Sequence, residues 1–307
     1  HWGVYDHSTV DDYRARLDGG REAIPSMLDR FAELGIHASW ATVGLLLCDG
    51  REDALAQYPD HPHYSQLGVR LRDVIERSGG SEAEDPYHYA KSLVERIMQL
   101  PGQEIATHTF SHFYCLEDGP SVADFEDDLK VAKAVASRHG IELSSIVFPR
   151  NQYDAAHLAA CRRQGITAFR GNPKSAPYRP RNEGETSRAT RLTRLVDAYV
   201  EVVPSDELLS RRSEEGGIVN VPASRFLRPV AKWDRRLSGL RLKRICKEMN
   251  EAARQGADYH LWWHPHNFGT RTDENFELLD AILSHYLDLR RELGMESMSI
   301  AEAASRS

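Results

Sequence analysis

Apolar positions along this chain alternate between a helical spacing and short continuous runs. Apolar residues recur every three or four positions within 21–34, which predicts a helix that ends at Gly35. The next run, 36–47, is almost continuously apolar, as in a strand that is covered on both faces. Helix, glycine and strand then recur in this order, which predicts parallel strands with helices outside them.

The later segments repeat this pattern. The predicted helices are 87–100, 122–140, 155–164, 237–255 and 276–293, and the predicted strands are 104–106, 145–148, 166–169, 217–221 and 259–263. The polar stretch 49–89 interrupts the pattern and is expected to form an inserted loop region with a short helix near 69–75. We expect an α/β fold, a distorted, TIM-like (β/α) barrel of about seven parallel strands in a single domain, 1–307. An open doubly wound sheet is the alternative.

Polar side chains follow four of the predicted strands, at the point where each strand ends. These residues are His108, His112, Arg150, Arg170, His264 and His266. The C-terminal ends of parallel barrel strands meet at one mouth, where such folds carry their sites. We therefore expect the six side chains to share one site.

The two histidines after the strand 104–106 are candidate metal ligands. His108 and His112 are spaced so that both can bind one divalent cation, provided that a carboxylate or water completes the shell. Zn²⁺ is the expected metal, and Co²⁺, Ni²⁺ and Mn²⁺ are alternatives for these ligands. Thr109 is expected to hydrogen-bond the turn that sets their spacing. The alternative is a pair of buried structural histidines.

The other strand ends supply candidate catalytic and substrate-binding residues. His264 is expected to protonate a leaving group, and His266 is expected to bind substrate or to take the role of the acid. Arg150 is a catalytic candidate because its planar fork can hold a substrate oxygen, and Arg170 is a substrate-binding candidate for the same reason. Trp263 is the candidate sugar platform, although only one of the two neighbouring tryptophans can face the pocket when strand side chains alternate.

Charge and composition exclude several functions. Lys and Arg number 39 against 46 Asp and Glu, and the net charge of -7 argues against binding to nucleic acid. No stretch approaches the roughly 20 apolar residues of a membrane span. No GxGxxG or GxxxxGK[ST] loop supports nucleotide binding. Asp6 and the charges of 235–247 are expected at the solvated surface.

Cysteine usage bears on the location of the protein. The four cysteines are widely spread without a CxxC pair, which is typical of reduced thiols and favours a cytoplasmic protein. The chain begins without a methionine or a signal-like segment, so an upstream segment is expected to have been removed. The oligomeric state is left open.

Three motifs resemble the polysaccharide deacetylase family, the chitooligosaccharide deacetylase homology domain. HTFSH resembles its H-[ST]-x-x-H metal motif, GIHASWATVG its second strand and WWHPHNFG its last motif. The resemblance implies a metal-dependent hydrolase that removes N-acetyl groups from an amino sugar in a polysaccharide or glycan precursor. In such an enzyme His108 and His112 would bind the metal and His264 would be the acid. A carbohydrate is the implied substrate.

The sequence also departs from this family. The acidic residues that supply its third metal ligand and its base would lie just before His1, so we expect that the first strand is cut away and that this fragment is weakly active or inactive. FPRNQY and AFRGNP replace two further family segments on the substrate side. Two alternatives remain open, a cyclic-amide or ureide hydrolase on the same scaffold and a non-catalytic saccharide-binding protein.

Overall fold

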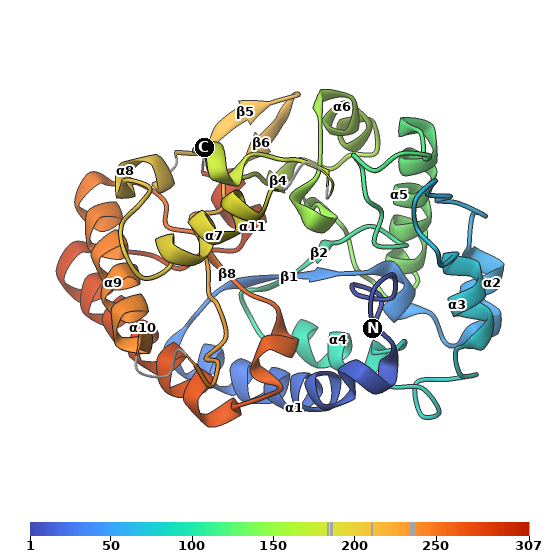
Figure 1. Ribbon diagram of the computed structural model, residues 1–307, viewed down its shortest axis with the longest axis horizontal. Coiled ribbons are helices and arrows are strands. Elements are labelled where there is room, and N and C mark those ends of the chain that lie inside the picture. Colours follow the sequence, from blue (N-terminus) through green and yellow to red (C-terminus); the bar gives the residue numbers. More distant parts are fainter. Residues whose placement is uncertain (183, 185–186, 210, 234–236, 307) are drawn as a thin grey trace.

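Short parallel strands form the centre of the structure, and helices surround them (Figure 1). The computed structural model describes residues 1–182, 184, 187–209, 211–233 and 237–306. A six-stranded sheet has the order β1-β2-β3-β4-β6-β5, in which β5 pairs antiparallel with β6 and the other pairs are parallel. Its strands are β1 (Ala38–Thr42), β2 (Gln103–Thr107), β3 (Ser145–Val147), β4 (Ala168–Arg170), β5 (Ser213–Glu215) and β6 (Ile218–Asn220).

A second, two-stranded sheet pairs β7 (Arg225–Phe226) with β8 (Leu261–Trp262) in parallel. Side chains of the β8 segment and of β1, including Leu261 and Trp40, pack on the same apolar cluster. The predicted α/β class with parallel strands is confirmed. The strand pairing in the described chain does not show a closed barrel, because the larger sheet ends at β1 on one side and at β5 on the other.

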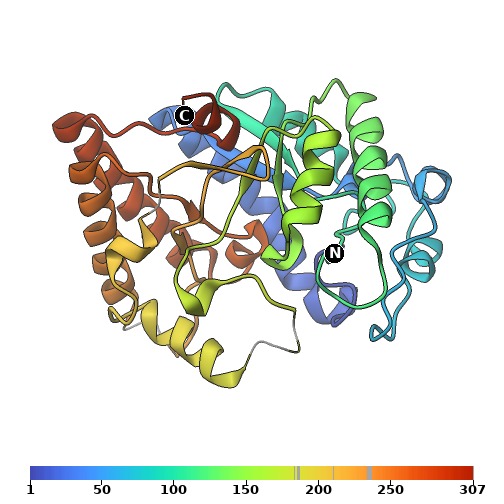
Figure 2. The ribbon, with the colours of Figure 1, turned by 90° about the horizontal axis from the view of Figure 1, so that it is seen from above.

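The helices lie around these two sheets, and Figure 2 shows α9 and α10 together at one end of the molecule. The helices are α1 (Val10–Leu34), α2 (Arg51–Gln57), α3 (Leu71–Arg77), α4 (Lys91–Met98), α5 (Val122–Ser137), α6 (Ala155–Arg163), α7 (Arg188–Asp197), α8 (Ser205–Leu208), α9 (Ser238–Gln255), α10 (Thr272–Leu293) and α11 (Ile300–Ser305). In the part of the chain that the structure describes, none of them is both long and apolar enough to cross a membrane.

The end of β1 differs from the predicted strand 36–47. Gly35 ends α1 with a left-handed φ of 64°, as expected. After β1, however, the chain turns into a 3-10 helix, Gly44–Leu47, because the backbone of Gly44 follows the turn that holds Phe110. The amide of Gly44 donates to the carbonyl of Thr109 over 2.8 Å, and a Cβ at this position would lie 2.9 Å from the Phe110 ring. The turn after β2 thus packs directly on the end of β1.

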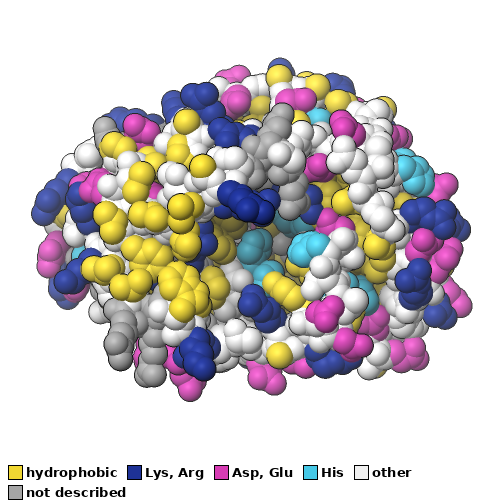
Figure 3. Space-filling view, in the orientation of Figure 1, with side chains coloured by type: hydrophobic (Ala, Val, Ile, Leu, Met, Phe, Trp, Pro, Cys, Tyr) yellow, Lys and Arg dark blue, Asp and Glu magenta, His cyan; other side chains and the backbone are white. Residues whose placement is uncertain are grey.

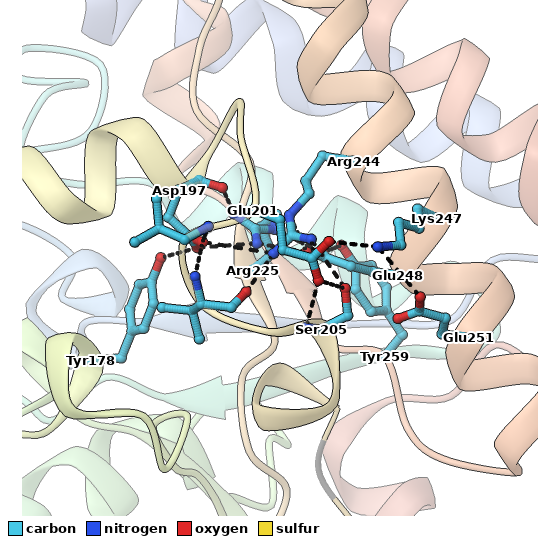
Figure 4. Close-up of polar contacts among 12 residues, drawn as sticks. Tyr178, Asp197, Glu201, Ser205, Arg225, Arg244, Lys247, Glu248, Glu251 and Tyr259 are labelled. Carbon is cyan, nitrogen blue, oxygen red and sulfur yellow. Dashed lines mark hydrogen bonds and ion pairs between the residues drawn. The ribbon is translucent and has the colours of Figure 1, made fainter.

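Some of the charges predicted on a solvated helix face are instead buried, and Figure 4 shows the polar contacts that they make. On α9, Arg244 and Glu248 are 5% and 0% exposed, and Arg225 of β7 donates to Glu248 over 2.6 and 2.7 Å. Asp197 adds a second buried carboxylate, 3.2 Å from Arg225. The prediction of a solvated face is wrong here because these carboxylates compensate the arginines inside the protein. Arg235, at the start of the predicted face, lies outside the described residues.

Candidate functional site

The turn after β2 carries His108 and His112. Their ring centroids lie 4.8 Å apart with the planes at 65°. Nδ1 of His108 donates to the carbonyl of Val147 over 2.6 Å, which fixes the tautomer and leaves Nε2 as an acceptor. Burial lowers the pKa of His108 to about 3 and the pKa of His112 well below its ordinary value. Both imidazoles are therefore neutral at neutral pH.

Hydrogen bonds inside the protein hold this turn in place. Thr109 has a positive φ of 64°, and its hydroxyl accepts from the amide of Phe113 over 2.7 Å, as predicted for this residue. Asp128 of α5 is completely buried and accepts from the amides of Phe110 and Ser111 over 2.7 and 3.1 Å. Burial raises the pKa of Asp128 to about 7 although these hydrogen bonds oppose the shift. The two amides have their partner on a different element, so α5 positions the histidines.

Replacing Asp128 by alanine is expected to lower the free energy of unfolding by about 2–4 kcal/mol, because two buried amides would lose their acceptor. Urea unfolding followed by circular dichroism measures this change. Asp127→Ala is the matched control, since Asp127 has a 54% exposed side chain and pairs with Lys130 on the surface. A loss below about 1 kcal/mol for Asp128→Ala would show that the turn does not depend on this carboxylate.

Arg150 follows β3 in a 3-10 turn and meets two carboxylates. It forms an ion pair with Asp6 and lies 3.5 Å from a carboxylate oxygen of Glu117. Its guanidinium also lies over the ring of Tyr114, 3.9 Å from the centroid. The side chain of Asp6 is only 2% exposed, so the prediction that Asp6 lies at the surface is wrong.

The first residues of the chain bring Asp6 into the site. Trp2 is buried, and its ring nitrogen donates to the carbonyl of His88 over 2.6 Å. A Cβ on Gly3 would lie 3.6 Å from Nε2 of His112, so this segment passes directly over the histidine turn. The packing of Trp2 thus anchors the segment, which places Asp6 beside Arg150. Residues 2–7 form turns, and for this reason the spacing of strand ends did not reveal Asp6.

A second pair of histidines follows β8. The rings of His264 and His266 stack with centroids 5.0 Å apart and planes at 7°. Helix α1 packs closely on this segment, since a Cβ on Gly20 would lie only 2.9 Å from Cα of His266. His264 is exposed on one side, yet the surrounding protein and then the charge of Arg170 lower its pKa to about 4. Burial lowers the pKa of His266 to about 3, so both rings are neutral at neutral pH.

Arg170 at the end of β4 is buried without a carboxylate beside it in the described chain. It is 8% exposed, donates to the side-chain oxygen of Asn151 over 2.6 Å and stacks 4.2 Å from the ring of Trp262. Burial lowers its pKa to about 9, and its Nε has no hydrogen-bond partner among the described atoms. Trp263, the predicted sugar platform, instead packs against Phe31 and the apolar cluster around α1 and α10. Trp262, the preceding residue, lies instead against the guanidinium of Arg170.

Figure 3 shows histidine side chains gathered in a hollow on one face of the molecule. The charge of Arg170 lowers the pKa of His108, and that of Arg150 lowers the pKa of His112, after burial in both cases. His264 acts on both histidines in the same way. The rings of His108 and His112 are in contact, and His264, Arg150 and Arg170 lie near enough to act on them electrostatically.

The described residues do not form a complete zinc site. No group of three or more His, Cys, Asp or Glu side chains in this part of the chain could hold a metal ion. His108 and His112 supply two donors, whereas a catalytic zinc takes three protein ligands and an open position. The predicted zinc centre is therefore unsupported. Binding of a divalent cation by the two histidines stays a prediction.

The comparisons with known proteins show a similarity of fold only. No protein-family model and no curated protein sequence matches this chain. The crystal structure of a GH57-type branching enzyme from the hyperthermophilic archaeon Pyrococcus horikoshii matches 97% of this chain and 67% of its own, with a TM-score of 0.51 and 12% identity. A 4-alpha-glucanotransferase from Thermococcus litoralis matches 70% of this chain, with a TM-score of 0.43 and 12% identity. The matched part spans 30% of the glucanotransferase, and a score of 0.43 is too low to compare folds.

These comparisons correct the predicted activity. The solved structure that resembles 97% of this chain is that of a branching enzyme and not of a deacetylase. The prediction of a zinc-dependent enzyme that removes N-acetyl groups is therefore wrong. The HTFSH motif forms the turn after β2, with the rings of its two histidines in contact. Its likeness to a deacetylase motif is not evidence of deacetylase activity.

Proposed function

We propose that this hollow is the active site of a carbohydrate-active enzyme that cleaves or transfers glycosidic bonds. The observation that carries the proposal is the pair of carboxylates, Asp6 and Glu117, which both contact Arg150. Enzymes that break glycosidic bonds use two carboxyl groups that lie about 5–10 Å apart. Two carboxylates that contact the same guanidinium, as Asp6 and Glu117 do, lie at a separation of this order.

The two carboxylates would divide the reaction between them. One carboxylic acid protonates the oxygen of the leaving sugar, and the other carboxylate attacks the anomeric carbon or activates a water or an acceptor hydroxyl. The side chain of Asp6 is 2% exposed and that of Glu117 is 18% exposed, so both are shielded from bulk solvent. Arg150 holds them in a fixed geometry, and its ring contact with Tyr114 restrains the guanidinium.

Aromatic and imidazole groups would bind the sugar rings. Trp262 and Phe226 lie with ring centroids 4.5 Å apart, and both line a cavity beside Arg150. Aromatic faces of this kind suit the apolar faces of sugars. His264 and His266, kept neutral by their surroundings, offer nitrogen atoms that can donate to or accept from sugar hydroxyls.

The proposal includes a closed barrel in which β7 and β8 lie between β6 and β1. Two features support this arrangement. The amide of Ala223 donates to the carbonyl of Gly171 over 2.9 Å, which ties the segment before β7 to the end of β4. On the other side, Leu261 of β8 and Trp40 of β1 share one apolar cluster. A GH57-type branching enzyme has a similar overall structure.

The test is activity on defined neutral and acidic oligosaccharides, with chain length followed by chromatography. Asp6→Asn and Glu117→Gln are each expected to lower kcat by about 10²–10⁴-fold with little change in KM, because the lost group acts in proton transfer or attack. Asp11→Asn is the matched control, since the side chain of Asp11 is 84% exposed and pairs only with Arg14 of its own helix among the described residues. Unchanged chain length on every glycan, or a wild-type rate in both variants, would contradict the proposal.

A further inference from the structure

A cavity of about 210 Å³ adjoins the proposed active site. Arg150, Asn151 and Trp262 form the side that faces the hollow, and the opposite side comes from the segment before α7, from α7 itself and from the residues around β7. Its lining includes six arginines, Arg150, Arg179, Arg181, Arg194, Arg225 and Arg228. Within the described chain, no Asp or Glu lines this cavity.

Two of these arginines already have carboxylate partners. Arg150 pairs with Asp6 and Glu117, and Arg225 is held by Glu248 in the buried network of Figure 4. Their charges are therefore compensated inside the protein. The net positive charge of the cavity comes from the other arginines.

Arg181, Arg194 and Arg228 lie around the cavity without such compensation. Nε of Arg194 donates to the carbonyl of Pro177 over 2.6 Å, and Arg181 donates to the carbonyl of Ala176 over 3.0 Å. These acceptors are neutral, and none of the three arginines forms an ion pair with a carboxylate in the described chain. The three guanidiniums belong to different parts of the fold, the loop after residue 178, α7 and the loop after β7.

The arginines also repel one another. Burial lowers the pKa of Arg194, and the charges of Arg181 and Arg228 lower it further. Burial likewise lowers the pKa of Arg228. Like charges around a cavity of low polarity raise its electrostatic potential and favour an anion there. The adjoining Arg170, buried against Trp262 with an unpartnered Nε, adds a further cation between this cavity and the histidines.

We infer that this cavity binds an oxyanion carried by the saccharide substrate, either a phosphate or a carboxylate group. The planar forks of Arg181, Arg194 and Arg228 match the oxygen geometry of both anions. Trp262 belongs to the cavity and also contacts Arg170, so a sugar ring on Trp262 would place its charged group among these arginines. The inference rests on the proposed function and narrows it to an enzyme that acts on acidic saccharides.

Calorimetric titration of the full chain tests this inference without requiring turnover. The probes are glucose 6-phosphate, glucuronate, glucose and inorganic phosphate, each at low and at raised salt. At least one charged sugar is expected to bind at least about 10-fold more tightly than glucose, with an affinity that falls as salt screens the arginines. Tighter binding of glucose 6-phosphate assigns the cavity to phosphate, and tighter binding of glucuronate assigns it to a carboxylate. Equal binding of glucose and both charged sugars would overturn the inference.

Three substitutions locate the binding to the cavity. Arg194→Gln and Arg228→Gln are each expected to weaken binding of the charged sugar about 10-fold and to leave binding of glucose unchanged. Arg181→Gln is a second route, because Arg181 is only half-buried and its loss is easier for the fold to tolerate. Arg188→Gln is the matched control, since Arg188 is exposed on α7 and does not line the cavity. Wild-type affinity in all three cavity variants would overturn the site.

The two proposals can fail separately. Selective binding of a charged sugar, lost in the cavity variants, together with unchanged chain length on every glycan would remove the glycosidic activity and keep the anion site. Turnover of neutral glycans at the wild-type rate by Arg194→Gln, without preference for a charged sugar, would remove the anion site and keep the glycosidic activity.

Discussion

Replacing Glu248 by alanine is expected to lower the free energy of unfolding by about 3–5 kcal/mol. Glu248 is completely buried and accepts from Arg225 over 2.6 and 2.7 Å and from the hydroxyl of Tyr259 over 2.8 Å (Figure 4). Arg244 of the same helix lies 3.0 Å from it. Without the carboxylate, the two buried guanidiniums would keep Asp197 as their only buried counter-charge among the described residues, because Glu201, 3.0 Å from Arg244, is 36% exposed.

The control for this substitution lies one helical turn along α9. Glu251→Ala removes a carboxylate that lies 3.7 Å from Lys247, with side-chain exposures of 30% and 50%, and is expected to cost less than about 1 kcal/mol. Chemical unfolding of both variants measures the difference. If Glu248→Ala retained nearly wild-type stability, the buried network would not hold α9 against β7.

Acidification is expected to destabilise the protein steeply between about pH 6.5 and pH 4. In this range the histidines of an unfolded chain take up protons, whereas burial lowers the pKa of His108 to about 3, that of His260 to about 4 and that of His112 well below its ordinary value. The folded state therefore binds fewer protons, and its stability, complete above pH 6.5, is lost as the pH falls. Asp128 contributes to this pH dependence in the opposite direction. Burial raises its pKa to about 7, so in this range the folded state holds a proton that the unfolded chain releases.

His264 and His266 have lowered pKa values as well, so five histidines against one carboxylate leave a net difference of about four protons, or roughly 5.4 kcal/mol per pH unit. Since domains are stable by about 5–15 kcal/mol, unfolding without denaturant is expected near the lower end of this range. The urea midpoint measured at several pH values gives the slope. His260→Gln should reduce it by about one proton, whereas His63→Gln, at an exposed position, should leave it unchanged. A flat profile between pH 6.5 and 4 would show that these histidines are protonated in the folded protein.

The sequence alone predicts the succession of helices and strands well, because long amphipathic helices and short apolar runs carry clear periodicities. The helix over 276–293 corresponds to α10, and the strand over 217–221 to β6. The long strand predicted over 36–47 is too long because apolar residues in a 3-10 turn are as buried as those in a strand. Leu45 and Leu47 face the core from that turn. Hydrophobicity records burial and does not distinguish these two conformations.

Only part of the site could be predicted from the sequence, because positions at strand ends are visible in the sequence whereas the packing of other segments is not. Strand ends converge in a parallel fold, so His108, Arg170 and His264 could be assigned to one hollow from their positions in the sequence. Asp6 could not, because the packing of Trp2, far from any strand end, decides where it lies. The arginines around the cavity gave a compositional signal in the Pro- and Arg-rich loop 172–191, but composition did not show that they face inward.

Activity was the least predictable property. The spacing of two histidines allows metal binding, yet a spacing does not specify the remaining ligands or the bond that is attacked. Within the described chain the neighbours of His108 and His112 are arginines, aromatic rings and other imidazoles rather than a third metal ligand. The carboxylates near this turn contact Arg150 instead, which is the arrangement on which the glycosidic proposal rests.

One substrate can test that proposal against its main competitor. An acidic oligosaccharide that carries N-acetyl groups and a label at its reducing end contains both glycosidic and amide bonds. Incubation with the full chain, followed by mass spectrometry of the labelled chains and an assay of free acetate, reports on both at once. We expect labelled chains of altered length with their acetyl groups intact, and no such change with Asp6→Asn. Release of acetate from chains of unchanged length would contradict the account.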